Sequence, residues 1–270
     1  MVKAQVETDA DYGGRWTSLQ LRGREWLWRR TDPARASVRP GDAFVDVGGL
    51  EECVPTVRGA PDHGAAWSRA WQRAGDTESV DCGDFFLART VRCTDDEVQA
   101  YYRLMAQPGY RFVWAAHALL DVSPAASVEI PDGTPVRLYP EAALLLPDGW
   151  PGDALFVEGQ WPTPCGLPLH RLGPDDGTAI GAVAVGCRTV GVLDGDRLVM
   201  RLTAAEDVPA SVALWRNLGG FPPDRPYRSI GVEPMLGAVF DRAHAGANDA
   251  VTVPASGSVE WQLTITAEAA

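Results

Sequence analysis

Short runs of alternating apolar and polar residues, each ended by a glycine or proline, constrain the fold of this chain most. The 270 residues include 28 glycines and 21 prolines, so turns recur at short intervals and a long helix has little room. Alternation with a period of two is the pattern of β-strands that bury one face. Many short strands joined by tight turns are typical of a large antiparallel β-sandwich or barrel. We therefore predict an all-β fold.

Several segments carry the signature of a β-hairpin. An Asp-Gly pair between alternating apolar residues is the strongest short-range hairpin signal, and it occurs twice in this form. In the segment 16–30, WTSLQLRGREWLWRR, apolar residues alternate on both sides of a glycine. We expect a hairpin at each of four turns, namely Gly23, Asp132-Gly133, Asp194-Gly195 and Ser256-Gly257.

The segment 94–106 is compatible with two structures. Thr94 and Glu97 have the spacing of a capping box, which would begin a helix. The residues from Val98 to Leu104 also alternate between apolar and polar, which is a strand pattern. We favour a strand because the flanking segments are predicted strands. Further strands are predicted over 81–94 and 110–122, and loops with short strands over 150–172.

Composition excludes several classes of protein. The formal net charge is −12 and the sequence pI is about 4.7, so the chain lacks the basic surface that nucleic acids and anionic membranes attract. It shows no apolar leader and no run of about 18 apolar residues that could cross a membrane. The five cysteines have no CxxC spacing, so reduced thiols in a cytoplasmic protein are expected. Without a linker or repeat, residues 1–270 are predicted to form one domain, as a monomer or homodimer.

The segment 48–71 gathers titratable and aromatic side chains between glycines and prolines. Such side chains on an irregular loop suit a functional site, whereas the alternative is a polar surface loop. They are Glu51, Glu52, Arg58, Asp62, His63, Trp67, Arg69 and Trp71. We expect the adjacent Glu51 and Glu52 to have a positioning or structural role.

Two residues outside this segment could transfer protons. His117 lies in an apolar predicted strand, where histidine is more often a hydrogen-bonded core residue, although histidine is also the usual acid or base near neutral pH. Glu233 lies in the apolar sequence IGVEPM, where a buried carboxylate would suit a general base and an edge-strand carboxylate would face water. His170 and His244 are expected at the surface.

Motifs for other chemistries are missing from the sequence. No two histidines have the HxH or HxxxH spacing of a metal site. Neither a glycine-rich nucleotide-binding motif nor the GxSxG of a serine nucleophile occurs. We expect neither a metal nor an organic cofactor.

Three segments in this order resemble the aldose 1-epimerase (galactose mutarotase) superfamily, and most closely its bacterial aldose epimerase-like branch. They are PDHGAAWSRAW around His63, VWAAHALLDV around His117, and ALWRNLGGFP with YRSIGVEPMLG around Glu233. The resemblance extends over nearly the whole chain. It implies a large antiparallel β-sandwich, the supersandwich of this family, with a sugar cleft open on one sheet.

The resemblance also implies roles for these residues. Glu233 would take the proton of the anomeric hydroxyl, His117 would protonate the ring oxygen, and His63 would hydrogen-bond the sugar. The pyranose would open, rotate about its C1–C2 bond and reclose as the other anomer, without a cofactor. The ligand implied is a monosaccharide or a derivatised hexose.

The sequence departs from the family pattern in three places. The arginine expected upstream of the first histidine has no clear match, and Arg58 lies in that region with two glutamates. The aspartate expected between the second histidine and the late glutamate has two candidates, Asp175 and Asp176. Around His117, small and aliphatic residues replace the usual polar and aromatic ones, namely Ala115, Ala116, Ala118 and Leu119.

A carbohydrate-binding protein without turnover is the alternative function. Most of the ten tryptophans are expected in the core, but indole rings also stack on sugar rings. The candidate substrate-binding residues are Asp62, Trp67, Arg69, Trp71, Trp161, Trp215 and Asn217. A third possibility, a β-sandwich scaffold without a sugar site, requires His63, His117 and Glu233 to lie far apart.

Overall fold

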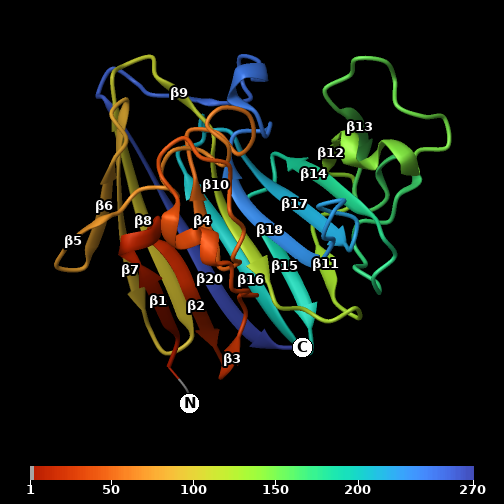
Figure 1. Cartoon of the computed structure of the whole chain (residues 1–270), viewed down its shortest axis with the longest axis horizontal. Helices are drawn as coiled ribbons and strands as arrows, with labels where there is room; N and C mark the ends of the chain where they lie inside the picture. The colour runs from red at the N-terminus through yellow and green to blue at the C-terminus, as the bar shows by residue number, and fades with distance from the viewer. Residues whose placement is uncertain (1–2) are drawn as a thin grey trace.

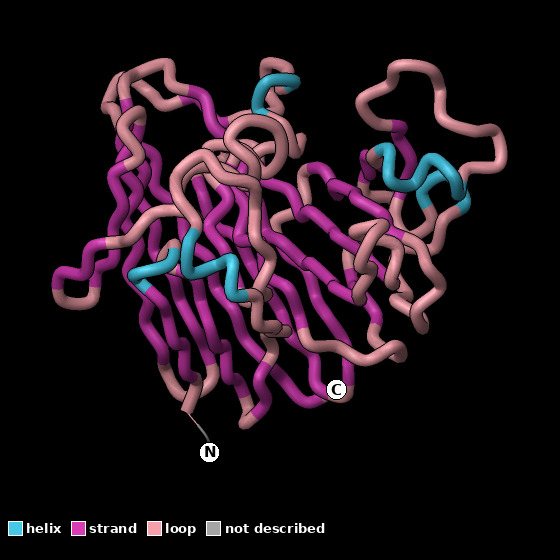
Figure 2. The backbone as a smooth tube through the Cα atoms, in the orientation of Figure 1, coloured by secondary structure: helices cyan, strands magenta, loops and turns pink. Residues whose placement is uncertain are grey.

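The computed structural model describes residues 3–270 and is built mainly from two large antiparallel sheets (Figures 1 and 2). The ten-stranded sheet has the order β1-β2-β4-β10-β18-β17-β14-β12-β13, with β3 paired to β2. Its strands are β1 (Gln5–Asp9), β2 (Arg15–Leu21), β3 (Arg24–Glu25), β4 (Leu50–Cys53), β10 (Trp114–Leu120), β12 (Pro135–Leu138), β13 (Val157–Gln160), β14 (Ala179–Val185), β17 (Ala210–Leu218) and β18 (Arg228–Leu236).

The eight-stranded sheet has the order β11-β15-β16-β20-β8-β7-β6-β5. Its strands are β5 (Gln72–Ala74), β6 (Thr77–Asp81), β7 (Phe85–Cys93), β8 (Glu97–Ala106), β11 (Ser127–Glu129), β15 (Thr189–Asp194), β16 (Asp196–Ala204) and β20 (Ser258–Ala269). A small separate pair joins β9 (Arg111–Phe112) to β19 (Val251–Thr252). The helical elements are short 3-10 turns, namely η1 (Ala10–Tyr12), η2 (Pro33–Ser37), η3 (Pro140–Leu145), η4 (Pro164–Gly166) and η5 (Arg242–His244).

Aromatic side chains join the inner faces of the two sheets. Trp114 of β10 lies 4.9 Å from Tyr102 of β8 and 5.2 Å from Trp261 of β20, measured between ring centroids. Tyr102 and Trp261 are themselves stacked. These large rings belong to the main apolar core, and their burial is a major source of stability for the sandwich.

The outer face of the ten-stranded sheet is covered as well. Strand β10 is buried along its whole length, and its alternate residues belong to two different clusters. Trp114, Ala116 and Ala118 face the main core, whereas Ala115 contributes to a second cluster with Met235 and Phe240. Of the small residues around His117, Ala115 therefore packs on the outer face, whereas Ala116 and Ala118 pack between the sheets.

A buried group of charges also joins the two sheets. Arg89 of β7 contacts Glu52 of β4 at 2.6 Å and Glu78 of β6, and the side chains of Arg89 and Glu52 have no solvent exposure. Tyr102 and Trp114 donate further hydrogen bonds to Glu52 at 3.0 and 2.7 Å. Glu52 thus has the structural role expected of it, because its charge is neutralised and both carboxylate oxygens are hydrogen-bonded.

Most of the predicted strands are present. The all-β fold and the sandwich are confirmed, and the strand over 97–106 is confirmed against the helix alternative. The hairpins at Gly23 and at Asp194-Gly195 form through the pairs β2–β3 and β15–β16. The predicted strand over 81–94 is divided, because β6 ends at Asp81 and β7 begins at Phe85.

Two predicted hairpins are wrong. The chain does turn at Asp132-Gly133, where the Thr134 N–H donates to the Pro131 carbonyl, but β11 pairs with β15 and β12 with β13 and β14. Likewise β19 pairs with β9, whereas β20 pairs with β8 and β16. Both turns pass the chain from one sheet to another. The turn residues specify the reversal of the chain, but the partner of each strand depends on distant residues.

The five cysteines form no disulfide with one another in the described structure. Within residues 3–270 no helix is long and apolar enough to cross a membrane.

Removal of the buried cation tests its role. We expect Arg89→Met to lower the free energy of unfolding by about 3–5 kcal/mol, because Glu52 and Glu78 would remain buried without their positive partner. Denaturant unfolding followed by tryptophan fluorescence measures the change. Arg103→Met is the matched control, because Arg103 pairs with Glu260 at 3.6 Å at the surface, and should cost less than about 1 kcal/mol. Equal losses for the two variants would contradict this role for Arg89.

Candidate functional site

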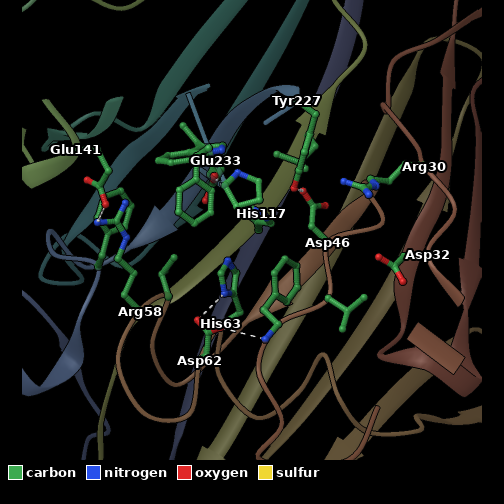
Figure 3. A pocket seen from close by; sticks show the side chains of 18 of the residues that line it. Arg30, Asp32, Asp46, Arg58, Asp62, His63, His117, Glu141, Tyr227 and Glu233 are labelled. Atoms are coloured by element: carbon green, nitrogen blue, oxygen red, sulfur yellow. Dashed lines mark hydrogen bonds and ion pairs between the residues drawn. The ribbon is translucent and has the colours of Figure 1, made fainter. Parts of the chain in front are cut away.

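A cavity of about 660 Å³ lies on the outer face of the ten-stranded sheet, over β10 and β18. Its volume is in the range of small-molecule sites. The floor carries His117, Leu119 and Glu233. Three loop segments, 30–46, 57–63 and 221–227, supply most of the walls. Figure 3 shows the side chains that line it.

Strand register brings the two proton-transfer candidates together. His117 pairs with Glu51 across β10 and β4. On the other side of β10, the pairs Ala115–Met235 and Leu119–Gly231 place His117 opposite Glu233. His117 Nδ1 lies 2.8 Å from Glu233 Oε1. The contact is an ion pair in which the N–H does not point straight at the oxygen.

The pair holds a positive charge on His117. Burial by itself lowers the pKa of the imidazole, but the negative charge of Glu233, with smaller contributions from Asp46 and Glu51, raises the His117 pKa to about 9. His117 is therefore an imidazolium at neutral pH. Glu233 is 2% exposed, and its second oxygen, Oε2, has no hydrogen-bond partner among residues 3–270. The arrangement offers one proton donor and one carboxylate at the same cavity.

His63 is neutral, whereas His117 is positively charged. Burial lowers its pKa, and the nearby His117 charge lowers it further against the opposing effect of Asp62. Its Nδ1 lies 2.8 Å from Asp62 Oδ1, and this hydrogen bond helps to lower the Asp62 pKa. A neutral His63 that donates from Nδ1 to the Asp62 carboxylate leaves Nε2 as an acceptor. The ring centroids of His63 and His117 are 5.2 Å apart.

The backbone around His63 explains the His-Gly sequence. His63 has a φ of 55°, in the left-handed region, and Gly64 follows with a φ of 83°. A Cβ on Gly64 would lie 2.2 Å from the Val54 carbonyl oxygen, so glycine is required for this close approach. The Ala65 N–H then donates to the same carbonyl at 2.7 Å. This turn holds the imidazole against the floor of the cavity.

The loop before β4 covers the two histidines. Phe44 stacks on His63 with ring centroids 3.8 Å apart and meets His117 edge-on at 5.7 Å. Its N–H donates to Asp62 Oδ2 at 3.0 Å. Arg35 anchors the start of this loop through Glu51, at 2.9 Å, and the Trp67 carbonyl. Glu51 thus has a positioning role, and its burial raises its pKa to about 7 against the charge of Arg35.

Some expected contacts line the cavity and others lie elsewhere. His63, His117, Glu233, Asp62 and Trp215 all line it. Four other candidates are placed away from it, which corrects their predicted role as direct contacts. Trp161 and Trp71 lie in the main core, and Trp67 is buried with its N–H donating to the Asp62 carbonyl. The fourth, Arg69, is not among the residues that line the cavity.

Asn217 is a fifth candidate that does not line the cavity. Its Nδ2 donates to the carbonyls of Phe221 and Tyr227, each at 2.8 Å, and its Oδ1 accepts from Gly220 and Phe221. The side chain is fully buried. Asn217 therefore shapes the loop that carries Phe221, Arg225 and Tyr227 into the cavity, and does not face the cavity itself.

The remaining candidates are at the surface. Asp175 pairs with Arg228 at 2.8 Å, and Asp176 accepts from Thr178. Neither lies at the cavity, so the expected aspartate is not supplied by these residues. His244 is exposed beside Asp241, as predicted, whereas His170 is half-buried.

Several cavity residues were not predicted. Asp46 accepts from Tyr227 and from the Gly48 N–H, and Arg30 lies over the Tyr227 ring. Glu141 pairs with Arg58 at 2.8 Å. These residues come from loops without a motif, so spacing in the sequence could not reveal them. In the part of the chain that the structure describes, no group of three or more His, Cys, Asp or Glu residues is arranged to hold a metal ion.

The charge states of the histidines can be measured directly. We expect the His117 imidazole to titrate near pH 9 and His63 below its ordinary value. Glu233→Gln removes the main negative neighbour, so burial should then bring the His117 pKa to its ordinary value of about 6.5 or below. NMR of protein labelled in the histidine rings follows all four histidines. An unchanged His117 titration in Glu233→Gln would contradict the proposed origin of the charge.

Comparisons with known proteins identify the fold. No protein-family model matches the chain, and no curated protein sequence matches it. Solved structures do match. A protein from Synechocystis sp. PCC 6803 is 14% identical with a TM-score of 0.66, and the match covers 99% of this chain and 92% of that one.

Two further matches carry descriptive names. A galactose mutarotase-like protein from Lactobacillus casei ATCC 334 is 15% identical with a TM-score of 0.63, covering 98% of this chain and 97% of the other. A galactose mutarotase related enzyme from Lactobacillus acidophilus is 12% identical with a TM-score of 0.64, covering 100% and 96%. At such identities the likeness concerns the fold. The chain therefore has the galactose mutarotase-like β-sandwich fold, which agrees with the resemblance found in its sequence.

Proposed function

We propose that this protein interconverts the anomers of a sugar by acid–base opening and closure of the ring, as an aldose 1-epimerase does. The observation that carries the proposal is the contact of 2.8 Å between His117 Nδ1 and Glu233 Oε1 on the floor of the cavity. Ring opening needs one group that accepts a proton and one that donates a proton, both within reach of the same substrate. Names of structural neighbours such as "galactose mutarotase-like" support the same assignment.

The reaction uses Glu233 as the proton acceptor and protonated His117 as the proton donor. Glu233 takes the proton of the anomeric hydroxyl, while the His117 imidazolium gives a proton to the ring oxygen. The C1–O5 bond breaks, and the open aldehyde rotates about C1–C2. On reclosure, His117 takes back the proton of the O5 hydroxyl and Glu233 returns its proton to O1. Protons balance over the cycle, and both side chains end in their starting states.

The surroundings of Glu233 and His117 favour proton transfer to a bound sugar over proton exchange with water. Glu233 is 2% exposed and His117 is 8% exposed, and Phe44 covers the histidines from the loop side. Charges in such a partly dry site interact more strongly than in water. His63, neutral and fixed by Asp62, is in place to accept a hydrogen bond from a sugar hydroxyl. Trp215 supplies an aromatic side chain to the cavity wall.

The alternative is a protein that binds a sugar in this cavity without turnover. The same aromatic and polar walls would serve it. Both functions predict sugar binding, and they differ in whether Glu233 affects the rate of anomer exchange. One variant therefore separates them.

Glu233→Gln tests the proposal. We expect wild-type protein to accelerate exchange between the anomers of D-glucose or D-galactose, and Glu233→Gln to lose about 10²–10⁴-fold of this rate, the usual contribution of a general base. Saturation-transfer NMR between the anomeric protons measures the exchange. Glu260→Gln is the matched control, because Glu260 lies at the surface. Equal rates of anomer exchange with and without wild-type protein, across a panel of aldoses, would contradict the proposed reaction. Sugar binding without turnover would then be the remaining function.

The pH profile tests the acid. Because His117 donates its proton only while protonated, kcat/KM should fall as pH rises through about 9. Polarimetry on a fresh single anomer measures the rate, after subtraction of the spontaneous reaction at each pH. A catalysed rate that stays level well above pH 9 would argue against His117 as the acid.

A further inference from the structure

We propose that Gly231 is a positioning residue for Glu233, because the space left by its missing side chain is where the Glu233 carboxylate lies against His117. The inference rests on the proposed function in treating Glu233 as the general base. Gly231 itself is not among the residues that line the large cavity, so it acts through Glu233. Figure 3 shows Glu233 beside His117 at the cavity.

Gly231 lies in the interior of β18, between Ile230 and Val232. Glycine in a strand interior weakens the strand, and it marks either an unusual backbone conformation or a close approach of other atoms. The φ of Gly231 is not positive, so its backbone conformation is open to other residues as well. Space, and not backbone conformation, is therefore what favours glycine at this position.

The atom nearest to the missing side chain belongs to Glu233. A Cβ on Gly231 would lie 2.5 Å from Glu233 Oε1 and 3.4 Å from Glu233 Cδ. Residues 231 and 233 share one face of β18, because side chains alternate along a strand. The Glu233 side chain thus folds back along its own strand, over Gly231. Its Oε1 is also the oxygen that lies 2.8 Å from His117 Nδ1, so one atom makes both approaches.

The neighbouring strands bound this space on two sides. Leu119 of β10 and Trp215 of β17 are the cross-strand partners of Gly231, and both line the cavity. A Cβ on Gly231 would lie 3.0 Å from Trp215 Cβ. Directly opposed residues have Cβ atoms about 4.5–5.5 Å apart, so the row has a side chain on each side of the glycine. The carboxylate oxygen therefore lies in a gap one residue wide.

An alanine at position 231 would put a methyl group at the place of the carboxylate oxygen. The nearest obstacle is the end of a side chain and not the backbone, so β18 can keep its pairing while the Glu233 carboxylate moves. Displacement of a reacting group by about 1 Å can cost about 10²-fold in rate. Gly231→Ala is thus expected to separate Glu233 from His117 while it keeps both residues.

The His117 titration tests this arrangement without turnover, by NMR of protein labelled in the histidine rings. In Gly231→Ala we expect the His117 pKa to fall from about 9 toward its value in Glu233→Gln, because the attraction that opposes burial is weakened. The other ionisable groups around His117, namely Asp46, Glu51 and His63, are unchanged. In the Glu233→Gln background, Gly231→Ala should shift the His117 pKa little further, since the displaced charge is already gone.

Anomer exchange of D-glucose or D-galactose is the second readout. We expect Gly231→Ala to lose about tenfold to 10²-fold in kcat, with a smaller change in KM. Gly191→Ala is the matched control, because Gly191 lies in β15 without a positive φ. A Cβ there would lie 2.7 Å from Oε2 of Glu129, a carboxylate that pairs with Arg197 away from the cavity. This control should titrate and turn over as wild type.

Circular dichroism establishes that each variant is folded. A His117 pKa that stays near 9 in folded Gly231→Ala, or a kcat equal to that of an active wild type, would overturn the inference. If Gly231→Ala does not fold, the added change Glu233→Ala removes the opposing carboxylate and should restore folding, and a double variant that also fails to fold would overturn it. If wild type exchanges no anomers, the proposed reaction fails, whereas the His117 titration still decides whether Gly231 positions Glu233.

Discussion

The ion pair between Glu52 and Arg89 is the interaction on which the arrangement of this molecule depends. Both side chains are fully buried between the sheets, and a charge there is tolerated only with its partner in place. Glu52 must therefore point inward from β4. Because side chains alternate along a strand, its neighbours Glu51 and Cys53 must point outward. The pair thus determines which face of β4 belongs to the core and which to the cavity.

The register of the neighbouring strands follows from that choice. Glu51 lies opposite His117, and the register of β10 with β18 brings Glu233 to the other side of the same histidine. One histidine between two acidic side chains results, in a row across three strands. A slip of one residue in β10 would send His117 into the core and Trp114 outward. The stability of the sandwich and the chemistry of its outer face therefore depend on one alternation pattern.

Loops cover the row formed by Glu51, His117 and Glu233 and supply the walls of the cavity. Arg35 connects the row to the loop that carries Phe44, since it binds Glu51 and donates to the carbonyl of Val45 in that loop. Asn217 performs the same task for the loop that carries Tyr227. These buried polar contacts satisfy backbone groups that the irregular loops would otherwise leave unpaired. They allow a cavity to be built from segments with little regular structure.

The sequence by itself determined the all-β fold and most strands, and it named five residues that line the cavity, namely Asp62, His63, His117, Trp215 and Glu233. It could do so because period-two alternation and turn residues act locally, and because the order of the histidines and the late glutamate resembled a family. It did not reveal that the strands flanking Gly133 and Gly257 belong to different sheets, since pairing depends on distant partners. Nor did it reveal Phe44, Asp46 and Glu141 at the cavity, or place Trp161 and Asn217 away from it. Which loop side chains face a shared space is decided only when the sheets pack, because burial and pairing of their charges depend on residues far apart in the chain.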